Sequence, residues 1–217
     1  MGLKEIYGAL LFRYGYQGWW PISESGSSEF SVPSFRYYSK DYSHPKNEKE
    51  QFEICIGALL TQNTNWNNVT KALGNLIQDD YLDSEKIIKL EDEKLQQLIK
   101  SSGYFRQKSE RVKLFSKRWG EVLENSKRME KMEFREFLLS LKGIGKETAD
   151  SMMLYAFKIP IFVIDAYTRR FCVHHKLFDS TKLDYDVYRN YFEKNLENDY
   201  KLFNEYHALI VRDQKLK

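Results

Sequence analysis

The spacing of apolar side chains predicts an almost entirely helical protein. In five segments, apolar residues recur at intervals of three and four positions, which places them on one face of a helix. These segments are residues 50–60, 66–77, 106–119, 185–196 and 200–211. Strict alternation is rare, and residues 159–164 are the best candidate for a strand. The pattern therefore predicts an all-α fold.

A Gly-x-Gly turn between two apolar helix faces is the most informative local feature. Apolar positions precede the turn at Phe134, Phe137, Leu138 and Leu141 and follow it at Thr148, Ala149, Met152, Met153 and Ala156. Gly143 and Gly145 permit positive φ and leave room for a close neighbour. Free N–H groups at the start of the second helix favour an anion such as a DNA phosphate, a contact that reads no base. A simple corner between two core helices is the alternative interpretation.

Asp165 is the candidate catalytic carboxylate. It follows the apolar run 161–164 and precedes residues 166–173, which can form a helix. By itself, such an aspartate is typical of a helix N-cap. A carboxylate at the end of a buried run, close to a phosphate-binding hairpin, also suits chemistry on DNA.

These features resemble the helix-hairpin-helix-Gly/Pro-Asp superfamily of DNA glycosylases, the endonuclease III group. The matching segments are the hairpin 141–150, the Thr148-to-Asp165 spacing, the Gly-Ala-Leu-Leu-Thr-Gln-Asn-Thr string 57–64, the Gly-Tyr…Lys element 102–108 and Trp19-Trp20-Pro21. The likeness covers residues 50–212. It is greatest for the 3-methyladenine DNA glycosylase III type.

The resemblance implies a fold, a partner and a set of site residues. It implies one domain, residues 1–217, built as a two-lobed helical bundle with the active site in the cleft between the lobes. The partner is double-stranded DNA containing a damaged base, bound by a monomer. In the implied site, Asp165 is the catalytic residue. Trp19 and Trp66 sandwich the base, and Lys215 is the lysine of the substrate pocket. Gln62 fills the gap in the duplex, and the remaining DNA contacts are Asn63, Gly143, Gly145, Lys146 and Thr148.

One departure from the wider superfamily concerns the nucleophile. Members that also nick the strand carry a lysine directly before the Thr-Ala of the hairpin, and its amine attacks the sugar. Here that position is Glu147, and Lys146 lies about 100° away around the helix. We therefore expect base removal by water, without lyase activity.

The cysteines argue against a metal cluster. Many relatives end in four cysteines that hold an iron–sulfur cluster, but this chain has only Cys55 and Cys172. Both lie in apolar runs, so we expect buried free thiols and a reducing cytoplasm. We expect no cofactor, while a monovalent cation at the hairpin remains open.

Composition limits the remaining interpretations. The net charge is +3 over 217 residues, which indicates a moderate basic face. Neither a membrane span nor a signal peptide is apparent. Residues 22–47 form an apparent insertion with an aromatic and basic string at Phe35-Arg36-Tyr37-Tyr38, which either touches nucleic acid or is a solvated loop.

The sequence thus predicts a glycosylase that flips out an alkylated purine such as 3-methyladenine and hydrolyses its glycosidic bond. Two alternatives remain open. One is a glycosylase for oxidised or mismatched pyrimidines, and the other is a catalytically silent DNA-binding module. Asp165, at the expected distance from the hairpin, argues against the silent module.

Overall fold

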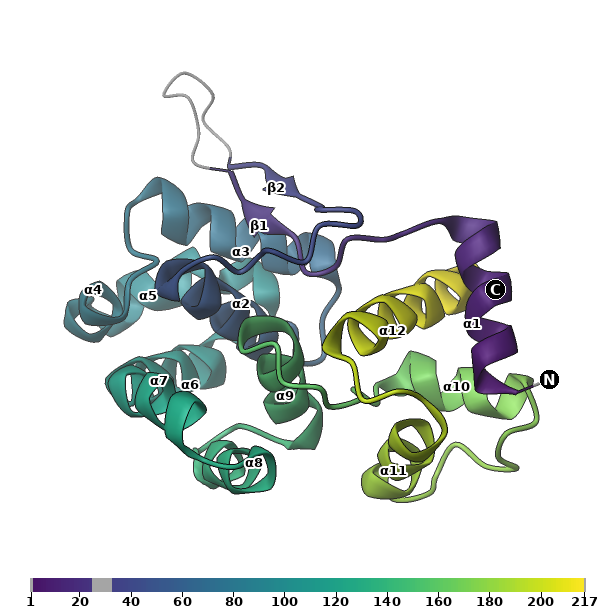
Figure 1. The fold of residues 1–217 in the computed structure, drawn as a ribbon. Helices are drawn as coiled ribbons and strands as arrows, with labels where there is room; N and C mark the ends of the chain where they lie inside the picture. Colours follow the sequence, from purple (N-terminus) through teal and green to yellow (C-terminus); the bar gives the residue numbers. More distant parts are fainter. Residues whose placement is uncertain (1, 25–32, 217) are drawn as a thin grey trace.

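Helices form two lobes in the computed structural model, which describes residues 2–24 and 33–216 (Figure 1). The larger lobe contains α2 (Glu48–Leu60), α3 (Trp66–Gln78), α4 (Ser84–Lys89), α5 (Asp92–Leu98), the 3₁₀ turn η1 (Lys100–Ser102), α6 (Phe105–Lys117), α7 (Trp119–Arg128), α8 (Lys131–Ser140), α9 (Lys146–Ser151) and the π-helix η2 (Met152–Ala156). The smaller lobe contains α1 (Leu3–Tyr14), α10 (Ala166–His174), α11 (Tyr185–Asn195) and α12 (Tyr200–Lys215). The prediction of a two-lobed all-α bundle is confirmed.

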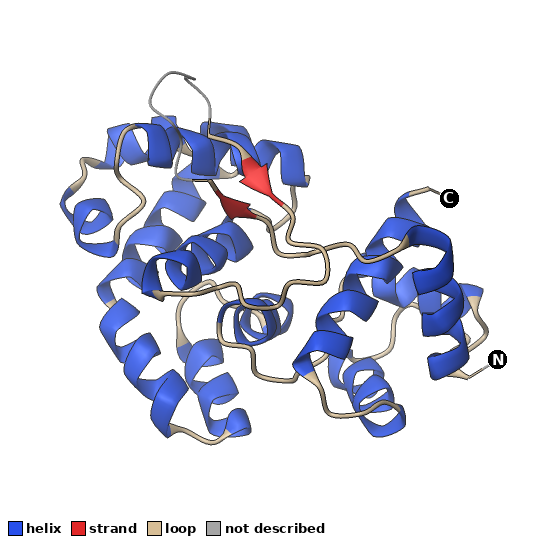
Figure 2. Cartoon of the chain, turned by 45° about the horizontal axis from the view of Figure 1, so that its top comes forward, coloured by secondary structure: helices blue, strands red, loops and turns tan. Residues whose placement is uncertain are grey.

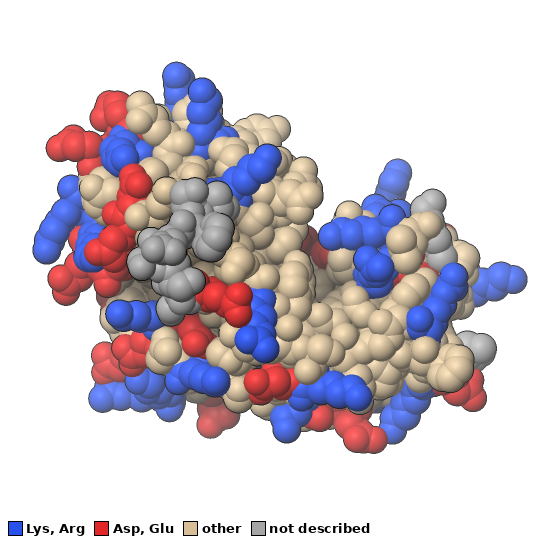
Figure 3. Space-filling view, turned by 90° about the horizontal axis from the view of Figure 1, so that it is seen from above, with Lys and Arg blue, Asp and Glu red and all other residues tan. Residues whose placement is uncertain are grey.

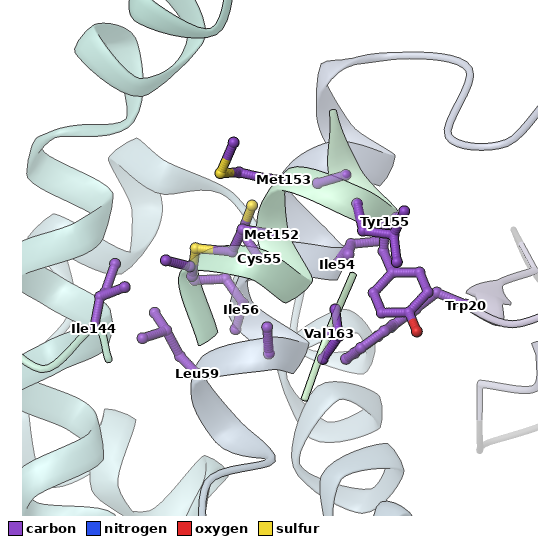
Figure 4. Close-up of a cluster of buried hydrophobic side chains, with 14 of the residues drawn as sticks. Trp20, Ile54, Cys55, Ile56, Leu59, Ile144, Met152, Met153, Tyr155 and Val163 are labelled. Atoms are coloured by element: carbon purple, nitrogen blue, oxygen red, sulfur yellow. The ribbon is translucent and has the colours of Figure 1, made fainter. Parts of the chain in front are cut away.

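Helix α2 is the centre of the larger lobe. Every residue from Phe52 to Leu60 is buried, because α3, α6 and the pair α9–η2 pack around it. Figure 4 shows the contact between α2 and η2, where aliphatic, sulfur-containing and aromatic side chains interdigitate. Cys55 and Cys172 are buried free thiols, as the sequence predicted.

The smaller lobe is held together by aromatic rings. Phe162 stacks on Phe192 with centroids 4.0 Å apart, and Phe203 and Tyr206 meet Phe162 edge to face. The Tyr206 hydroxyl donates to the carbonyl of Leu3, 2.9 Å away, and ties α12 to α1. Both ends of the chain therefore lie on this lobe (Figure 1).

The strand predicted at residues 159–164 is wrong. The segment is buried, but it has no partner strand among the described residues. Side chains from α11 satisfy its main chain instead: the N–H of Phe162 donates to Glu193, and that of Ile164 donates to the Tyr185 hydroxyl. An apolar run of this length is equally compatible with a buried connection between lobes.

Strands occur instead inside the apparent insertion. β1 (Ile22–Ser23) and β2 (Phe35–Arg36) pair antiparallel, with Ile22 opposite Arg36, and lie over the larger lobe (Figure 2). The part of the insertion at residues 25–32 lies outside the described residues. Buried Glu53 fastens β1 to α2, since its carboxylate accepts the N–H of Ser23 at 2.7 Å and its hydroxyl at 2.6 Å.

Most predicted helices are present within a few residues. The exception is the segment 106–119, where α6 ends at Lys117 and Trp119 already begins α7. Trp119 is a core residue, packed on Phe52 and Phe115. No helix in residues 2–24 and 33–216 is long and apolar enough to span a membrane.

Buried Lys108 closes the end of α2. Its ammonium donates to the carbonyl of Leu60 at 2.8 Å and to that of Ser102 at 2.6 Å. The last carbonyls of a helix have no partner inside the helix, so this lysine satisfies one of them and joins α6, α2 and η1. Lys108 thereby sets where the turn after α2 begins.

We predict that Lys108→Met destabilises the protein by about 2 kcal/mol or more, because methionine fills the space but leaves two buried carbonyls unpaired. Lys117→Met, on the exposed side of the same helix, is the control and should change the stability little. Denaturant unfolding measures both. Equal stability of the two variants would show that the Lys108 ammonium contributes nothing net.

Candidate functional site

A cavity of about 380 Å³ opens between the lobes. Its walls come from the chain before β1, the end of α2 and the turn after it, the start of α9, η2, the segment before α10, and α12. In the view from above, uncharged surface dominates the hollow between the two lobes (Figure 3). Both lobes therefore contribute residues to the cavity.

Asp165 lies in the wall of this cavity at the N-terminus of α10. One carboxylate oxygen, Oδ1, accepts the N–H of Thr168 at 2.7 Å and its hydroxyl at 2.9 Å. The other oxygen, Oδ2, is 3.6 Å from Nε2 of His207. Asp165 is thus an N-cap and a cavity residue at once, and the two interpretations of the sequence do not exclude each other.

Asp165 is held in its ionised form. Burial favours the neutral acid, but the neighbouring His207 and the two hydrogen bonds from Thr168 outweigh burial and lower the pKa of Asp165 below its ordinary value. The helix N-terminus also favours a negative charge at this position. A carboxylate is therefore present at neutral pH.

His207 and Tyr155 complete this side of the cavity, and sequence reasoning missed both. His207 lies on α12, and its Nδ1 is 2.6 Å from the hydroxyl of Tyr155 in the π-helix. Both side chains are buried and both line the cavity. Nothing in their sequence spacing indicated that α12 and η2 would bring them to Asp165.

Glu147 and Lys146 point in different directions. Glu147 lines the cavity, where burial by the surrounding walls and the charge of Asp165 raise its pKa to about 7, although part of the side chain remains open to solvent. The Lys146 ammonium is 2.6 Å from Asp186 and 3.3 Å from Asp184, and it is absent from the cavity wall. The two neighbouring side chains therefore do not aim at the same point, and Glu147 alone of the two faces the cavity.

Three tryptophans form the aromatic wall. Trp19 and Trp66 both line the cavity, but their rings touch, with centroids 4.8 Å apart and planes at 63°. No gap of base thickness separates them in this conformation, so they form one wall instead of the two faces of a slot. Trp20 lies behind them and packs on Gly57, where a Cβ would come within 3.0 Å of the indole.

One aromatic residue from the insertion also joins this wall. Tyr37 follows β2, lines the cavity and lies 6.1 Å from Trp19 between centroids. The string at residues 35–38 thus contributes one residue, Tyr37, to the cavity wall.

A buried glutamate fixes the chain that carries Trp19. The Glu205 carboxylate, on α12, accepts the N–H of Gln17 at 2.6 Å and the hydroxyl of Tyr42 at 3.0 Å. Burial raises the pKa of Glu205, while these hydrogen bonds oppose the rise. The Glu205 carboxylate therefore ties the chain just before Trp19 to α12.

The hairpin connects α8 to α9. Gly143 has a φ of 87°, and a Cβ there would come within 2.5 Å of the Arg111 side chain, so glycine is required. Gly145 differs from the expectation, because its φ of −97° is ordinary extended backbone and a Cβ there would meet nothing. The buried ion pair between Arg135 and Asp150 pins the two helices together.

Gln62 is bonded to this hairpin. Its amide nitrogen donates to the carbonyl of Gly143 at 2.9 Å and to the Thr148 hydroxyl at 3.0 Å, while Arg111 donates to its amide oxygen at 2.5 Å. The side chain is therefore held against the protein in the absence of DNA. Its neighbour Asn63 is exposed, with a left-handed φ of 54°.

Basic residues of α12 stand at the rim of the cavity. Arg212 and Lys215 both line it, and the Lys215 ammonium lies 5.7 Å from the centroid of the Tyr167 ring. Within the part of the chain that the structure describes, no three His, Cys, Asp or Glu side chains are grouped to hold a metal ion.

Comparison with known proteins identifies the family. A family model described as the HhH-GPD superfamily base excision DNA repair protein matches residues 56–197. The chain belongs to this superfamily and is a DNA glycosylase of base excision repair.

Two curated relatives and one solved structure support this placement, and a second solved structure shares the fold. The chain is 37% identical over 218 residues to the “Putative DNA repair glycosylase” of Methanocaldococcus jannaschii, covering 98% of this chain and 87% of that protein. It is 33% identical over 132 residues to endonuclease III of Thermotoga maritima, covering 58% of each. The H. pylori 3-methyladenine DNA glycosylase bound to 1,N6-ethenoadenine matches with a TM-score of 0.63 and 31% identity, over 79% of this chain and 91% of that one. A trapped covalent endonuclease III–DNA intermediate matches in fold, with a TM-score of 0.66 and 16% identity. The match covers 96% of this chain and 83% of that one.

We predict that Trp19→Ala and Trp66→Ala each weaken excision of a damaged base by roughly 1–3 kcal/mol, the value of one base–aromatic stack. Binding to an abasic product should change much less, since no base remains to stack. Trp119→Ala is the core control, and it should lower the melting temperature and all activities together. Single-turnover excision and melting curves on the same variants test this. If the Trp19 and Trp66 variants behave like the control, both residues serve only the core.

Proposed function

We propose that this glycosylase removes an N-alkylated purine, such as 3-methyladenine, by attack of water and without cutting the strand. The observation that carries the proposal is the ionised Asp165 in a cavity that has aromatic walls and a glutamate at position 147. The 31% identity to the H. pylori 3-methyladenine DNA glycosylase supports the choice of substrate class.

Recognition begins with the DNA backbone. The base is inaccessible inside a duplex, so the nucleotide has to be extruded into the cavity. We assign the N–H groups at the start of α9, with Thr148 beside them, to a phosphate, and exposed Asn63 to the same strand. Endonuclease III and an 8-oxoguanine glycosylase/lyase of M. jannaschii are known in complex with DNA, in the same fold.

Two of the expected DNA contacts need a change of partner. Gln62 would have to leave Gly143, Thr148 and Arg111 in order to fill the gap in the duplex. Lys146 already has carboxylate partners, so its charge would add little to phosphate binding unless they separate.

The aromatic wall suits a cationic base. An N-alkylated purine carries positive charge, and such a charge is attracted to the face of a tryptophan. Trp19, Trp66 and Tyr37 offer this surface on one side of the cavity. Lys215 and Arg212 stand at the rim, where their positive charge favours the phosphates over the cationic base.

Bond cleavage then depends on Asp165. As the C1′–N bond breaks, its electron pair leaves with the base, which becomes neutral, and positive charge develops on the sugar. The nearby carboxylate stabilises that charge. Water adds its oxygen to C1′ and gives its proton to Asp165 or onward to solvent, which completes the hydrolysis.

The decisive experiment measures abasic-site formation on duplexes that carry an alkylated purine, an oxidised pyrimidine or a mismatched thymine. We expect release of the alkylated purine alone. Asp165→Asn should abolish release while binding DNA as well as or better than the wild type, because a negative charge near phosphate is removed. Preferred release of the oxidised or mismatched base would overturn the substrate, and near wild-type excision by Asp165→Asn would overturn the role of Asp165.

A second prediction concerns covalent chemistry. Borohydride should trap no enzyme–DNA adduct, since Glu147 cannot form a Schiff base. The Lys146 amine forms an ion pair with Asp186 and does not line the cavity. An endonuclease III preparation provides the positive control. Efficient trapping that disappears in Lys146→Ala would show that Lys146 reaches the sugar.

A further inference from the structure

The interaction between Asp165 and His207 leaves one ring nitrogen without an assigned role. Nε2 of His207 is buried and has no hydrogen-bond partner among the described residues at ordinary bonding distance. Oδ2 of Asp165, 3.6 Å away, is the carboxylate oxygen that the two Thr168 donors leave free. A buried polar nitrogen that points at a catalytic carboxylate requires an explanation, because an unmade hydrogen bond costs free energy.

The Tyr155 hydroxyl determines which nitrogen carries the proton. Its one hydrogen-bond partner in the described part of the chain is Nδ1 of His207, at 2.6 Å. If the hydroxyl accepted a proton from Nδ1, its own hydrogen would be buried without an acceptor. Burial, followed by the charges of Asp165 and Glu205, raises the pKa of Tyr155 well above its ordinary value, so the hydroxyl keeps its proton and can donate it. Nδ1 is therefore the acceptor, and the proton of the ring lies on Nε2.

We propose that His207 is a positioning residue for the reaction, whose Nε2–H, fixed by Tyr155, is directed at Oδ2 of Asp165 and orients that carboxylate toward the sugar and the attacking water. This inference rests on the proposed hydrolytic function. Thr168 holds Oδ1 and His207 holds Oδ2, so the carboxylate cannot rotate. The remaining lone pair of Oδ2 then faces the cavity, where the substrate binds.

The π-helix supplies the local geometry. In η2 the N–H of Phe157 bonds to the carbonyl of Met152, five residues earlier, so the turn is wider than in an α-helix. The wide turn changes the direction of the side chains within it, and such turns are frequent at functional sites. Here the turn contains Tyr155. Its ring packs on Trp20, with centroids 5.4 Å apart, and its hydroxyl bonds to His207 on α12.

Two substitutions at the same position separate positioning from packing. In His207→Gln the side-chain nitrogen can occupy the place of Nε2, which preserves a donor to Asp165. In His207→Asn the shorter amide reaches only the place of Nδ1. We expect His207→Gln to keep the rate of single-turnover excision within a few-fold of wild type. His207→Asn should lower that rate about 10- to 100-fold, because it loses a hydrogen bond to a charged acceptor. Both should bind an abasic duplex like the wild type.

Tyr155→Phe tests the hydrogen bond between Tyr155 and His207. It keeps the ring but frees the histidine proton to move to Nδ1, so excision should fall by several-fold in the wild-type background. In the His207→Gln background it should cause no further loss, since glutamine has no tautomer to fix. Equal losses in the two backgrounds, or equal losses in His207→Gln and His207→Asn, would overturn the proposal.

A nitrogen NMR spectrum of His207 provides a readout that needs no DNA. We expect Nδ1 without a proton and Nε2 with one in the wild type, a shift of the Nε2 resonance in Asp165→Asn, and a mixture of tautomers in Tyr155→Phe. A proton on Nδ1 in the wild type overturns the inference even if a substituted protein unfolds. Failure of the wild type to release any alkylated base would instead overturn the proposed function, and the spectrum would still report the Tyr155–His207–Asp165 geometry.

Discussion

The site depends on keeping one carboxylate ionised although the protein buries most of it. Burying a charge is costly unless hydrogen bonds and compensating charge offset the loss of hydration. Asp165 obtains this compensation from three sources: the donors of Thr168, the N-terminus of α10, and His207 on α12. Each source belongs to a backbone element whose position is fixed by the packing of the smaller lobe. The arrangement of α10 against α12 is thus a requirement of the proposed chemistry as well as of the core.

The aromatic wall is fixed by a different set of buried charges. Glu205 holds the main chain just before Trp19, and Glu53 holds it just after Trp20, at Ser23. The two glutamates come from opposite lobes, so the tryptophan segment bridges the cleft and is tied at both ends. Burial raises the pKa of Glu53 to about 7. Its hydrogen bonds to Ser23 therefore do not fully compensate for the lost hydration of the carboxylate. Placement of the aromatic wall is therefore obtained at some cost in stability.

Local patterns predicted the helices and the hairpin because these depend on sequence spacing alone. Gly143 needs its positive φ, and Asp165 ends a buried run, so both could be recognised without a structure. The contacts between distant elements could not. Periodicity treats residues 152–156 as a continuing helix and gives no sign of the π-turn that directs Tyr155 to α12. It also cannot tell that residues 159–164 satisfy their main chain through side chains of α11, or that Trp19 and Trp66 touch each other.

Position 147 connects the electrostatics to the type of reaction. A lysine there would place an amine beside the sugar, and its charge would oppose a cationic base as well as the developing positive charge. A glutamate removes the nucleophile, and near neutral pH its carboxyl is partly ionised beside Asp165. Two carboxyl groups facing one cavity repel each other, which is part of why the pKa of Glu147 is raised. A positively charged base or sugar would relieve that repulsion on binding. Glu147 is therefore compatible with the proposed hydrolysis of a cationic alkylated purine, whereas a lysine at this position would favour covalent catalysis.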